Sequence, residues 1–251
     1  LLDRLELIEV PSYTEFEKLK IADGFLEEKQ RLANGLKEGD IKFTPEGVKE
    51  IIDSYTREAG VRQLDRTIAS ISRKAVVELL DHPETERPIV ITPEKVKEYL
   101  GVEIFEDSKK EKEPQVGVVT GLAYTEFGGD ILPIEVPHFP GKGGLVLTGK
   151  LGEVMRESAT IAVDYVRANA KKYGIPDSIF EENDIHIHFP EGAVPKDGPS
   201  AGVAITVAII SSLTGIPADN NIAMTGEVTL RGLALPIGGL REKSLAALRC
   251  G

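Results

Sequence analysis

Cysteine and histidine are both scarce in this chain of 251 residues. Its single cysteine, Cys250, excludes an intrachain disulfide, leaves no cysteine-rich zinc cluster and fits a reducing compartment. The four histidines are His82, His138, His186 and His188. No apolar run reaches membrane-spanning length, and the start, Leu1–Arg4, does not resemble a signal peptide. We therefore expect neither a membrane partner nor a bound metal.

Positive charge is in the minority, with 30 Lys and Arg against 41 Asp and Glu and a formal net charge of −11 at pH 7. Charge alone therefore does not favour a nucleic acid or an anionic membrane as the partner. Hydrophobic residues make up 41% of the chain and charged residues 28%, which is ordinary for a soluble globular protein. The length allows one large domain or two small ones.

Residues 1–100 are predicted to form a small helical domain with four helices. Three threonines have the position of helix caps: Thr14, Thr44 and Thr92. Thr14 and Glu17 have the spacing of a capping box, and the strongest apolar stripe, within residues 61–79, predicts the third helix. Short extended segments are expected before the second and fourth helices, at 41–43 and 89–91.

Residues 101–115 carry mixed charges without an apolar period and are predicted to be a linker. Residues 116–251 alternate strand and helix patterns and predict an α/β domain with mixed sheets. Strands are expected at 116–120, 131–136, 145–148, 184–189, 222–227 and 233–236, and helices at 152–172, 201–212 and 240–248. Gly128-Gly129-Asp130 is expected to be a turn. The fold class of the whole chain is therefore predicted to be α+β.

One turn-rich run, Pro195–Gly202, leads directly into an apolar helix. Pro199 suits the first helical turn, so Ser200 lies where the free N–H groups of the helix gather. These donors favour negative charge and are able to hold an oxyanion. The position alone leaves two interpretations of Ser200 open, a nucleophile or a helix cap without a catalytic role.

A nucleophilic serine needs a base, and histidine is the first choice to consider. His186 or His188, together with Asp197, would complete a Ser-His-Asp triad. The two histidines share one face of the strand expected at 184–189, because side chains alternate along a strand. Such a face is more often a half-buried polar surface, or a weak metal pair, than part of a catalytic site.

Lys243 is the other candidate base. An ordinary lysine has a pKa near ~10.4 and is a poor base at neutral pH. Burial beside the apolar residues of its own helix would lower this pKa and leave a neutral amine. These residues are Leu240, Leu245, Ala246 and Ala247. Arg241 is excluded because a guanidinium group stays protonated.

Residues 144–150 match the G-x-x-x-x-G-K pattern of a phosphate-binding loop. We reject this match, because Leu151 follows where the loop needs Ser or Thr for magnesium and the intervening residues favour a strand. The chain alone is therefore not expected to hydrolyse ATP. Arg62, at the start of the third helix, is either a surface arginine or a group that reaches a phosphate from a neighbouring domain.

Four long motifs occur in a fixed order: Pro190–Ala193, Pro195–Gly202, Met224–Gly232 and Leu235–Lys243. Together with Leu1–Arg4 and Tyr55–Arg62, they resemble the Lon proteases over nearly the whole chain. The resemblance implies an ATP-dependent serine endopeptidase that degrades misfolded and regulatory proteins through a Ser-Lys dyad. Ser200 aligns with the nucleophile, Lys243 with the general base, and Thr225 with a threonine that hydrogen-bonds the lysine. Arg241 stands where many relatives have lysine.

The resemblance also implies residues around the dyad. Asp197 and Glu227 align with acidic residues at the edge of the site. Tyr124, Thr125 and Glu126 fall in the segment that borders the substrate groove.

Residues 1–100 are similar to the helical lid subdomain of the family's AAA+ module. Arg62 aligns with the sensor-2 arginine, which contacts nucleotide, and Arg4 with the arginine finger that acts across a subunit interface. The family forms homohexameric rings that use ATP and Mg²⁺, but the Walker segments are missing from this sequence. The proteolytic domain, 116–251, also lacks its expected last part, and no cofactor of its own is implied.

A bacterial cytoplasm, or else a mitochondrial matrix, is the compartment that the resemblance implies. An alternative function of another class is a non-catalytic assembly module, or one that contacts DNA through its helical half. The acidic balance argues against strong DNA binding, which depends on neutralising phosphates with basic residues.

Overall fold

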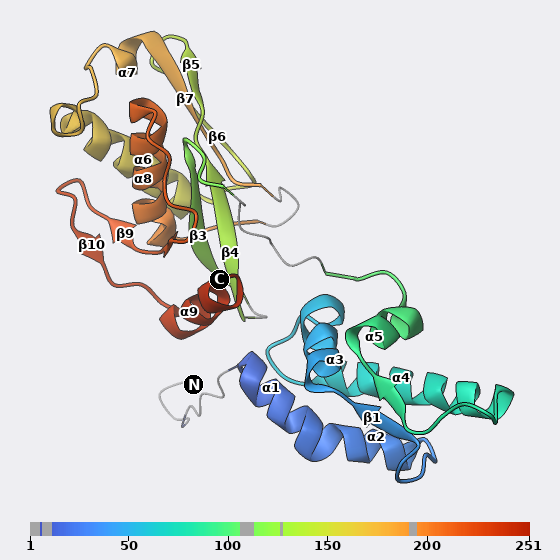
Figure 1. The fold of residues 1–251 in the computed structure, drawn as a ribbon. Coiled ribbons are helices and arrows are strands. Elements are labelled where there is room, and N and C mark those ends of the chain that lie inside the picture. The colour runs from blue at the N-terminus through green and yellow to red at the C-terminus, as the bar shows by residue number, and fades with distance from the viewer. Residues whose placement is uncertain (1–5, 7–11, 106–112, 126–127, 191–194) are drawn as a thin grey trace. The chain divides into compact units, whose positions relative to one another are not determined.

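The structure, a computed structural model, describes residues 6, 12–105, 113–125, 128–190 and 195–251 (Figure 1). The chain divides into two compact units, the first up to residue 107 and the second from residue 108 onward, apart from residues 126–128. The first unit is mainly helical and the second combines helices with mixed sheets, so the predicted α+β class is confirmed. Arg4 and Glu126 lie outside the described residues.

Helices of the first unit begin where the threonine caps predict. Its α-helices are α1 (Glu15–Ile21), α2 (Glu27–Ala33), α3 (Pro45–Glu50), α4 (Arg62–Asp81) and α5 (Pro93–Leu100). Two π-helical segments, η2 (Ala22–Leu26) and η3 (Ile51–Tyr55), join α1 to α2 and extend α3. The side chains of Thr14, Thr44 and Thr92 accept hydrogen bonds from N–H groups in the first turns of α1, α3 and α5. Thr14 and Glu17 form the predicted capping box.

The two extended segments of the first unit pair with each other. Strands β1 (Ile41–Phe43) and β2 (Ile89–Ile91) form a parallel two-stranded sheet at the residues predicted from the sequence. Their outer residues are buried and their central residues exposed, as the alternation of a strand requires. The inward side chains join Leu64, Ile68 and Ile71 of α4 in one hydrophobic core, which gives this unit a core of its own.

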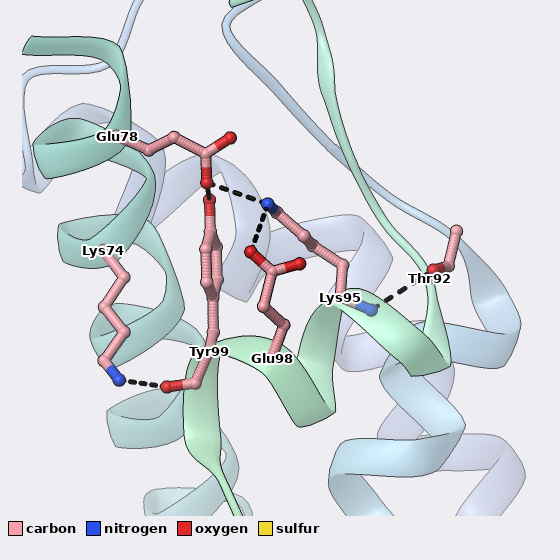
Figure 2. A network of polar contacts seen from close by, with 6 residues as sticks. All are labelled: Lys74, Glu78, Thr92, Lys95, Glu98 and Tyr99. Atoms are coloured by element: carbon pink, nitrogen blue, oxygen red, sulfur yellow. Dashed lines mark hydrogen bonds and ion pairs between the residues drawn. The ribbon is translucent and has the colours of Figure 1, made fainter. Parts of the chain in front are cut away.

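A polar network fastens α5 to α4 (Figure 2). Glu78 accepts hydrogen bonds from Lys95 Nζ at 2.8 Å and from the Tyr99 hydroxyl at 2.7 Å. Lys74, one turn before Glu78 on α4, donates to the main-chain carbonyl of Tyr99. The Lys95 ammonium and the Tyr99 hydroxyl together hold the pKa of Glu78 below its ordinary value. Helices α4 and α5 are thus held together by charge-assisted hydrogen bonds as well as by the hydrophobic core.

The second unit is built around one mixed sheet. Its strands are β3 (Val118–Thr125), β4 (Gly128–Glu135), β5 (His138–Pro140), β6 (Leu145–Thr148), β7 (Asn183–His188) and β8 (Ala223–Met224). The order is β5-β7-β4-β3-β8, with β6 also paired to β7. The β3–β8 and β6–β7 pairs are parallel, and β7 is antiparallel to β4 and β5. A separate antiparallel pair consists of β9 (Glu227–Val228) and β10 (Ala234–Leu235).

Helices of the second unit cover one face of this sheet (Figure 1). They are α6 (Glu153–Ala168), α7 (Ile179–Glu182), α8 (Gly202–Thr214) and α9 (Leu240–Arg249), with 3-10 turns η4 (Ala170–Tyr173) and η5 (Pro199–Ala201). Helix α8 is apolar nearly all round, because α6 lies on one side of it and β3 on the other. It ends at Gly215, whose φ of +71° is a left-handed conformation that suits glycine.

The expected turn at Gly128-Gly129-Asp130 is wrong, because these residues begin strand β4. Glycine occurs there for a different reason: the backbone of Gly129 lies directly against α9. Strand β5 and helix α7 were not expected from the sequence. Both are short, and neither has the apolar periodicity that would reveal it.

Candidate active site

The turn that carries Ser200 begins at Gly198, whose φ of +116° is hardly accessible to other residues. Pro199, Ser200 and Ala201 then form the 3-10 turn η5, which continues directly into α8. The expected position of Pro199 in the first turn is therefore confirmed. Ser200 is half-buried at the point where the chain enters the most apolar helix of the unit.

Hydrogen bonds from the segment after β8 hold this turn. The carbonyl oxygen of Ser200 accepts from the N–H of Gly226 at 2.8 Å and from Thr225 Oγ1 at 3.3 Å. The N–H of Val203 donates to the carbonyl of Gly226 at 3.0 Å. From the other side, Ser158 of α6 donates to the carbonyl of Pro199 at 3.2 Å. The serine backbone is thereby fixed between α6 and the loop that joins β8 to β9.

Hydrogen bonds of this kind also occupy several N–H groups that the expected oxyanion hole would use. The N–H of Val203 is directed at Gly226, that of Gly202 at Pro199, and that of Gly198 at the Asp197 carboxylate. An oxyanion that used any of these three N–H groups would have to displace the bond that the group makes in this conformation.

Lys243 lies on α9 and meets Ser200 by folding, 43 positions away along the chain. Its Nζ is 3.0 Å from Ser200 Oγ and 3.2 Å from Thr225 Oγ1. The lysine is only 3% exposed, and burial lowers its pKa below the ordinary value. A lysine in this setting sheds its proton more readily than one at the surface.

The burial of Lys243 comes only in part from the apolar residues of α9 that the sequence suggested, of which Ala246 is buried. Leu240 is 60% exposed and Leu245 is 38% exposed, so the leucines of α9 point largely to solvent. Lys243 and Ala246 form the inner face of the helix, one turn apart, and α9 packs on β3. Ala246 and the packing of α9 on β3 therefore both contribute to the burial that lowers the pKa.

Asp197 lies beside the turn and caps a different helix. Its Oδ1 accepts from the N–H of Met155, in the first turn of α6, at 3.0 Å, and from the N–H of Gly198 at 2.8 Å. The residue at the start of α6 is Gly152, which has no side chain to cap the helix. Asp197 thus does for α6 what a serine or aspartate at position 152 would do.

The other implied residues belong to different elements of the chain. Glu227 is the first residue of β9, half-buried and paired with Leu235. Tyr124 and Thr125 end strand β3, and the Tyr124 ring, 57% exposed, packs near Gly239 at the start of α9. Arg62 is exposed in the first turn of α4, within the first unit.

The histidine alternative finds no support in the geometry. His186 Nε2 lies 2.8 Å and His188 Nδ1 2.7 Å from Thr148 Oγ1, so both imidazoles engage the same hydroxyl on β6. Ser200 instead has the amine of Lys243 as its partner. Among the described residues no three His, Cys, Asp or Glu side chains gather as metal ligands do.

Two residues of this site escaped the sequence argument. Ser158 looks like any small residue within the apolar stripe of α6, and the sequence contains no sign of its bond to Pro199. Gly129 belongs to a Gly128-Gly129-Asp130 run that predicts a turn, so its close approach to α9 is evident only in the folded chain.

Two family models match this chain. Residues 90–251 match the Lon protease (S16) C-terminal proteolytic domain, and residues 32–88 match the Lon protease AAA+ ATPase lid domain. The chain belongs to the Lon protease family. The resemblance drawn from the motifs is therefore confirmed, and the second unit falls within the proteolytic domain of Lon.

Similar Lon proteases occur in several bacteria. The chain is 59% identical over its whole length to a Lon protease of Mycoplasma mycoides subsp. mycoides SC and 54% identical over its whole length to one of Bacillus thuringiensis (strain Al Hakam). It is 55% identical, over 99% of its length, to a Lon protease of Chloroflexus aggregans. The chain spans 31% of the length of each of these relatives. Within the described parts of the chain, no helix combines the length and the apolar character needed to span a membrane.

Proposed function

We propose that this chain is the peptide-cleaving part of an ATP-dependent serine endopeptidase, with Ser200 as nucleophile and Lys243 as general base. The observation that carries the proposal is the 3.0 Å distance between Lys243 Nζ and Ser200 Oγ, at a lysine that is almost completely buried. Hydrogen-bond reach between nucleophile and base is the geometric requirement for this chemistry. The proteolytic domain that the sequence matches supports the same reaction class.

The reaction proceeds in two halves. Neutral Lys243 takes the Ser200 proton while Ser200 Oγ attacks the carbonyl carbon of a peptide bond. The resulting ammonium returns the proton to the leaving amine as the C–N bond breaks, which leaves an acyl group on Ser200. Water then gives its proton to Lys243, attacks the ester and releases the second product, and Ser200 recovers its proton.

Thr225 orients the base in this scheme. Its Oγ1 accepts an N–H of Lys243 at 3.2 Å and donates its own proton to the Ser200 carbonyl at 3.3 Å. With one amine N–H engaged by Thr225, the nitrogen lone pair is free to face Ser200 Oγ. Asp197 and Glu227 act at the edge of the site, and Tyr124, Thr125 and Glu126 border the substrate.

We assign ATP dependence to a longer Lon protein, because the chain spans only 31% of the length of the relatives that it matches. We propose that residues 1–100 are the AAA+ lid, 101–115 a connection and 116–251 the protease domain of a homohexamer in the bacterial cytoplasm. An exposed arginine in the first turn of α4 fits a nucleotide phosphate, so Arg62 would hold ATP, with Mg²⁺ supplied by other parts of the protein. Arg4 would act on ATP bound to a neighbouring subunit. Hydrolysis of ATP would supply the energy that unfolds misfolded and regulatory protein substrates.

A peptidase assay with matched variants tests the dyad. Ser200→Ala and Lys243→Met are each expected to abolish cleavage of a fluorogenic peptide by the full-length protein. Ser244→Ala and Lys171→Met are the controls, because both side chains are exposed and Ser244 bonds only to its own helix at Leu240 among the described contacts. Cleavage that survives in either dyad variant contradicts the proposal, and cleavage lost in the controls as well would mean that the loss is not specific.

A further inference from the structure

We propose that Gly129 is a positioning residue for Lys243: the absence of a side chain at this position of β4 lets α9 approach closely enough to bring its lysine to Ser200. This inference rests on the proposed function for its catalytic consequence, but the structural part stands on packing alone. It explains why glycine occurs inside a strand rather than in a turn.

The contact involves main chain on both sides. A Cβ atom on Gly129 would lie 2.0 Å from the carbonyl oxygen of Glu242, 2.4 Å from its carbonyl carbon and 2.9 Å from the nitrogen of Lys243. Carbon and oxygen atoms without a bond between them stay more than 3 Å apart, so even an alanine at 129 would force one backbone to move. Because the atoms that Gly129 approaches are all main chain, they cannot swing aside as the end of a side chain can. A shift of α9 would therefore displace Lys243 directly.

Two more contacts hold α9 against the same pair of strands. At its beginning, Gly239 packs against the ring of Tyr124 on β3, where a Cβ would lie 3.0 Å from the ring carbon Cγ. At its end, the Arg249 guanidinium lies 4.0 Å from the Asp130 carboxylate on β4. The helix thus contacts β3 and β4 in its first turn and at its end, and the first-turn contact with β4 lies at Lys243 itself.

The distances at the dyad leave little room for such a shift. Lys243 Nζ must stay near both Ser200 Oγ, at 3.0 Å, and Thr225 Oγ1, at 3.2 Å. A displacement of about 1 Å at a reacting group is enough to lower a rate by about 10²-fold. Moving α9 away from the strands would also let water reach the ammonium, so the pKa of Lys243 would rise toward its ordinary value.

The test compares Gly129→Ala with Gly238→Ala in the full-length protein. Gly238 is exposed just before α9, has a backbone that alanine tolerates and has open space around its Cβ position. Gly129→Ala is expected to lower kcat about 10²-fold while KM changes less than about threefold. The pH at which kcat/KM reaches half its maximum is expected to move upward, and Gly238→Ala is expected to leave both values unchanged.

A readout without catalysis separates this inference from the proposed function. The titration of the Lys243 ζ-nitrogen, followed by NMR in protein labelled with ¹⁵N-lysine and assigned with Lys243→Arg, is expected to shift to higher pH in Gly129→Ala. An unchanged titration overturns the inference, whether or not the enzyme cleaves peptides. Full activity in Ser200→Ala would overturn the dyad and leave this NMR result standing.

Arg249→Ala covers the case in which Gly129→Ala does not fold. It weakens the attachment of α9 to β4 without adding an atom, and it is expected to raise the Lys243 pKa by a smaller amount. If the titration of Lys243 is unchanged in whichever of Gly129→Ala and Arg249→Ala folds, β4 does not position the lysine.

Discussion

At the scale of single residues, the buried amine of Lys243 that the proposed reaction needs also lowers the stability of the fold. Its pKa is lowered by burial, so the unfolded chain binds more protons than the folded chain at pH values between the two pKa values. The free energy of unfolding therefore rises with pH through this window. Below it, the folded protein carries the full cost of a buried ammonium.

Lys243→Met is accordingly expected to stabilise the fold while abolishing cleavage. Methionine keeps the apolar stem and removes the group that resists burial. The melting temperature at pH 7 is expected to rise by a few degrees, and the gain is expected to shrink as the pH approaches ~10.4, the ordinary lysine value. Thermal unfolding of both proteins at several pH values measures this. A gain that does not depend on pH would mean that the amine is not the cause.

Thr225 offers a second test at this scale. Thr225→Ala removes the acceptor for the Lys243 N–H and the donor to the Ser200 carbonyl, and kcat is expected to fall about 10-fold or more. Thr225→Ser keeps the hydroxyl and is expected to retain most of the activity. Steady-state kinetics of the two variants would contradict this role for Thr225 if serine were as damaging as alanine.

At the scale of elements, the nucleophile turn and helix α6 depend on each other through Asp197. Its carboxylate accepts from Met155 on α6 and from Gly198 in the turn, and the methylene of any side chain at Gly152 would clash with it. A helix cap normally comes from the residue just before the helix. Here it comes from a segment more than 40 residues later, so the same carboxylate caps α6 and holds the turn that carries Ser200.

Asp197→Ala is expected to lower the free energy of unfolding by about 1 kcal/mol, the usual value of a helix cap, and to lower kcat as well. Asp197→Asn keeps an oxygen for the Met155 N–H and is expected to retain most of both. Urea unfolding and peptide cleavage measure the two effects. A loss of stability in Asp197→Ala without any change in kcat would show that the turn does not rely on this contact.

The sequence predicts best those elements that are fixed by local interactions. The threonine caps place the starts of α1, α3 and α5. The expected strands match β1, β2 and β6, and the alternating run at 184–189 places β7 within one residue. Contacts between distant segments escape it. Gly128–Asp130 looks like a turn locally, and only the packing of α9 on Gly129 explains why this position of the strand is a glycine. The motifs indicate Ser200 and Lys243, but Ser158 has no local signature.

At the scale of the whole molecule, two separate cores lie in one chain. The first contains Leu64, Ile68 and Ile71 of α4, and the second is formed by α6, α8 and the inner faces of the large sheet. The described residues of each core belong to one unit. Damage to the first core is therefore expected to leave the dyad intact.

Leu64→Ala tests this independence. Leu64 is completely buried, so its truncation is expected to cost about 2–5 kcal/mol in the first unit. Calorimetry of the chain is expected to show one transition at a lower temperature and a second one unchanged. Cleavage of a short peptide is expected to persist at temperatures where the first unit has already unfolded. A single transition that shifts as a whole would mean that the two units unfold together.

The most direct test of the central claim is covalent labelling of Ser200 by a serine-directed fluorophosphonate, followed by mass spectrometry of the labelled peptide. If neutral Lys243 activates Ser200, the unaltered chain acquires the label at Ser200, Lys243→Met reacts at least about 10²-fold more slowly, and Lys171→Met reacts at the normal rate. Equal labelling of the unaltered chain and Lys243→Met would contradict the account.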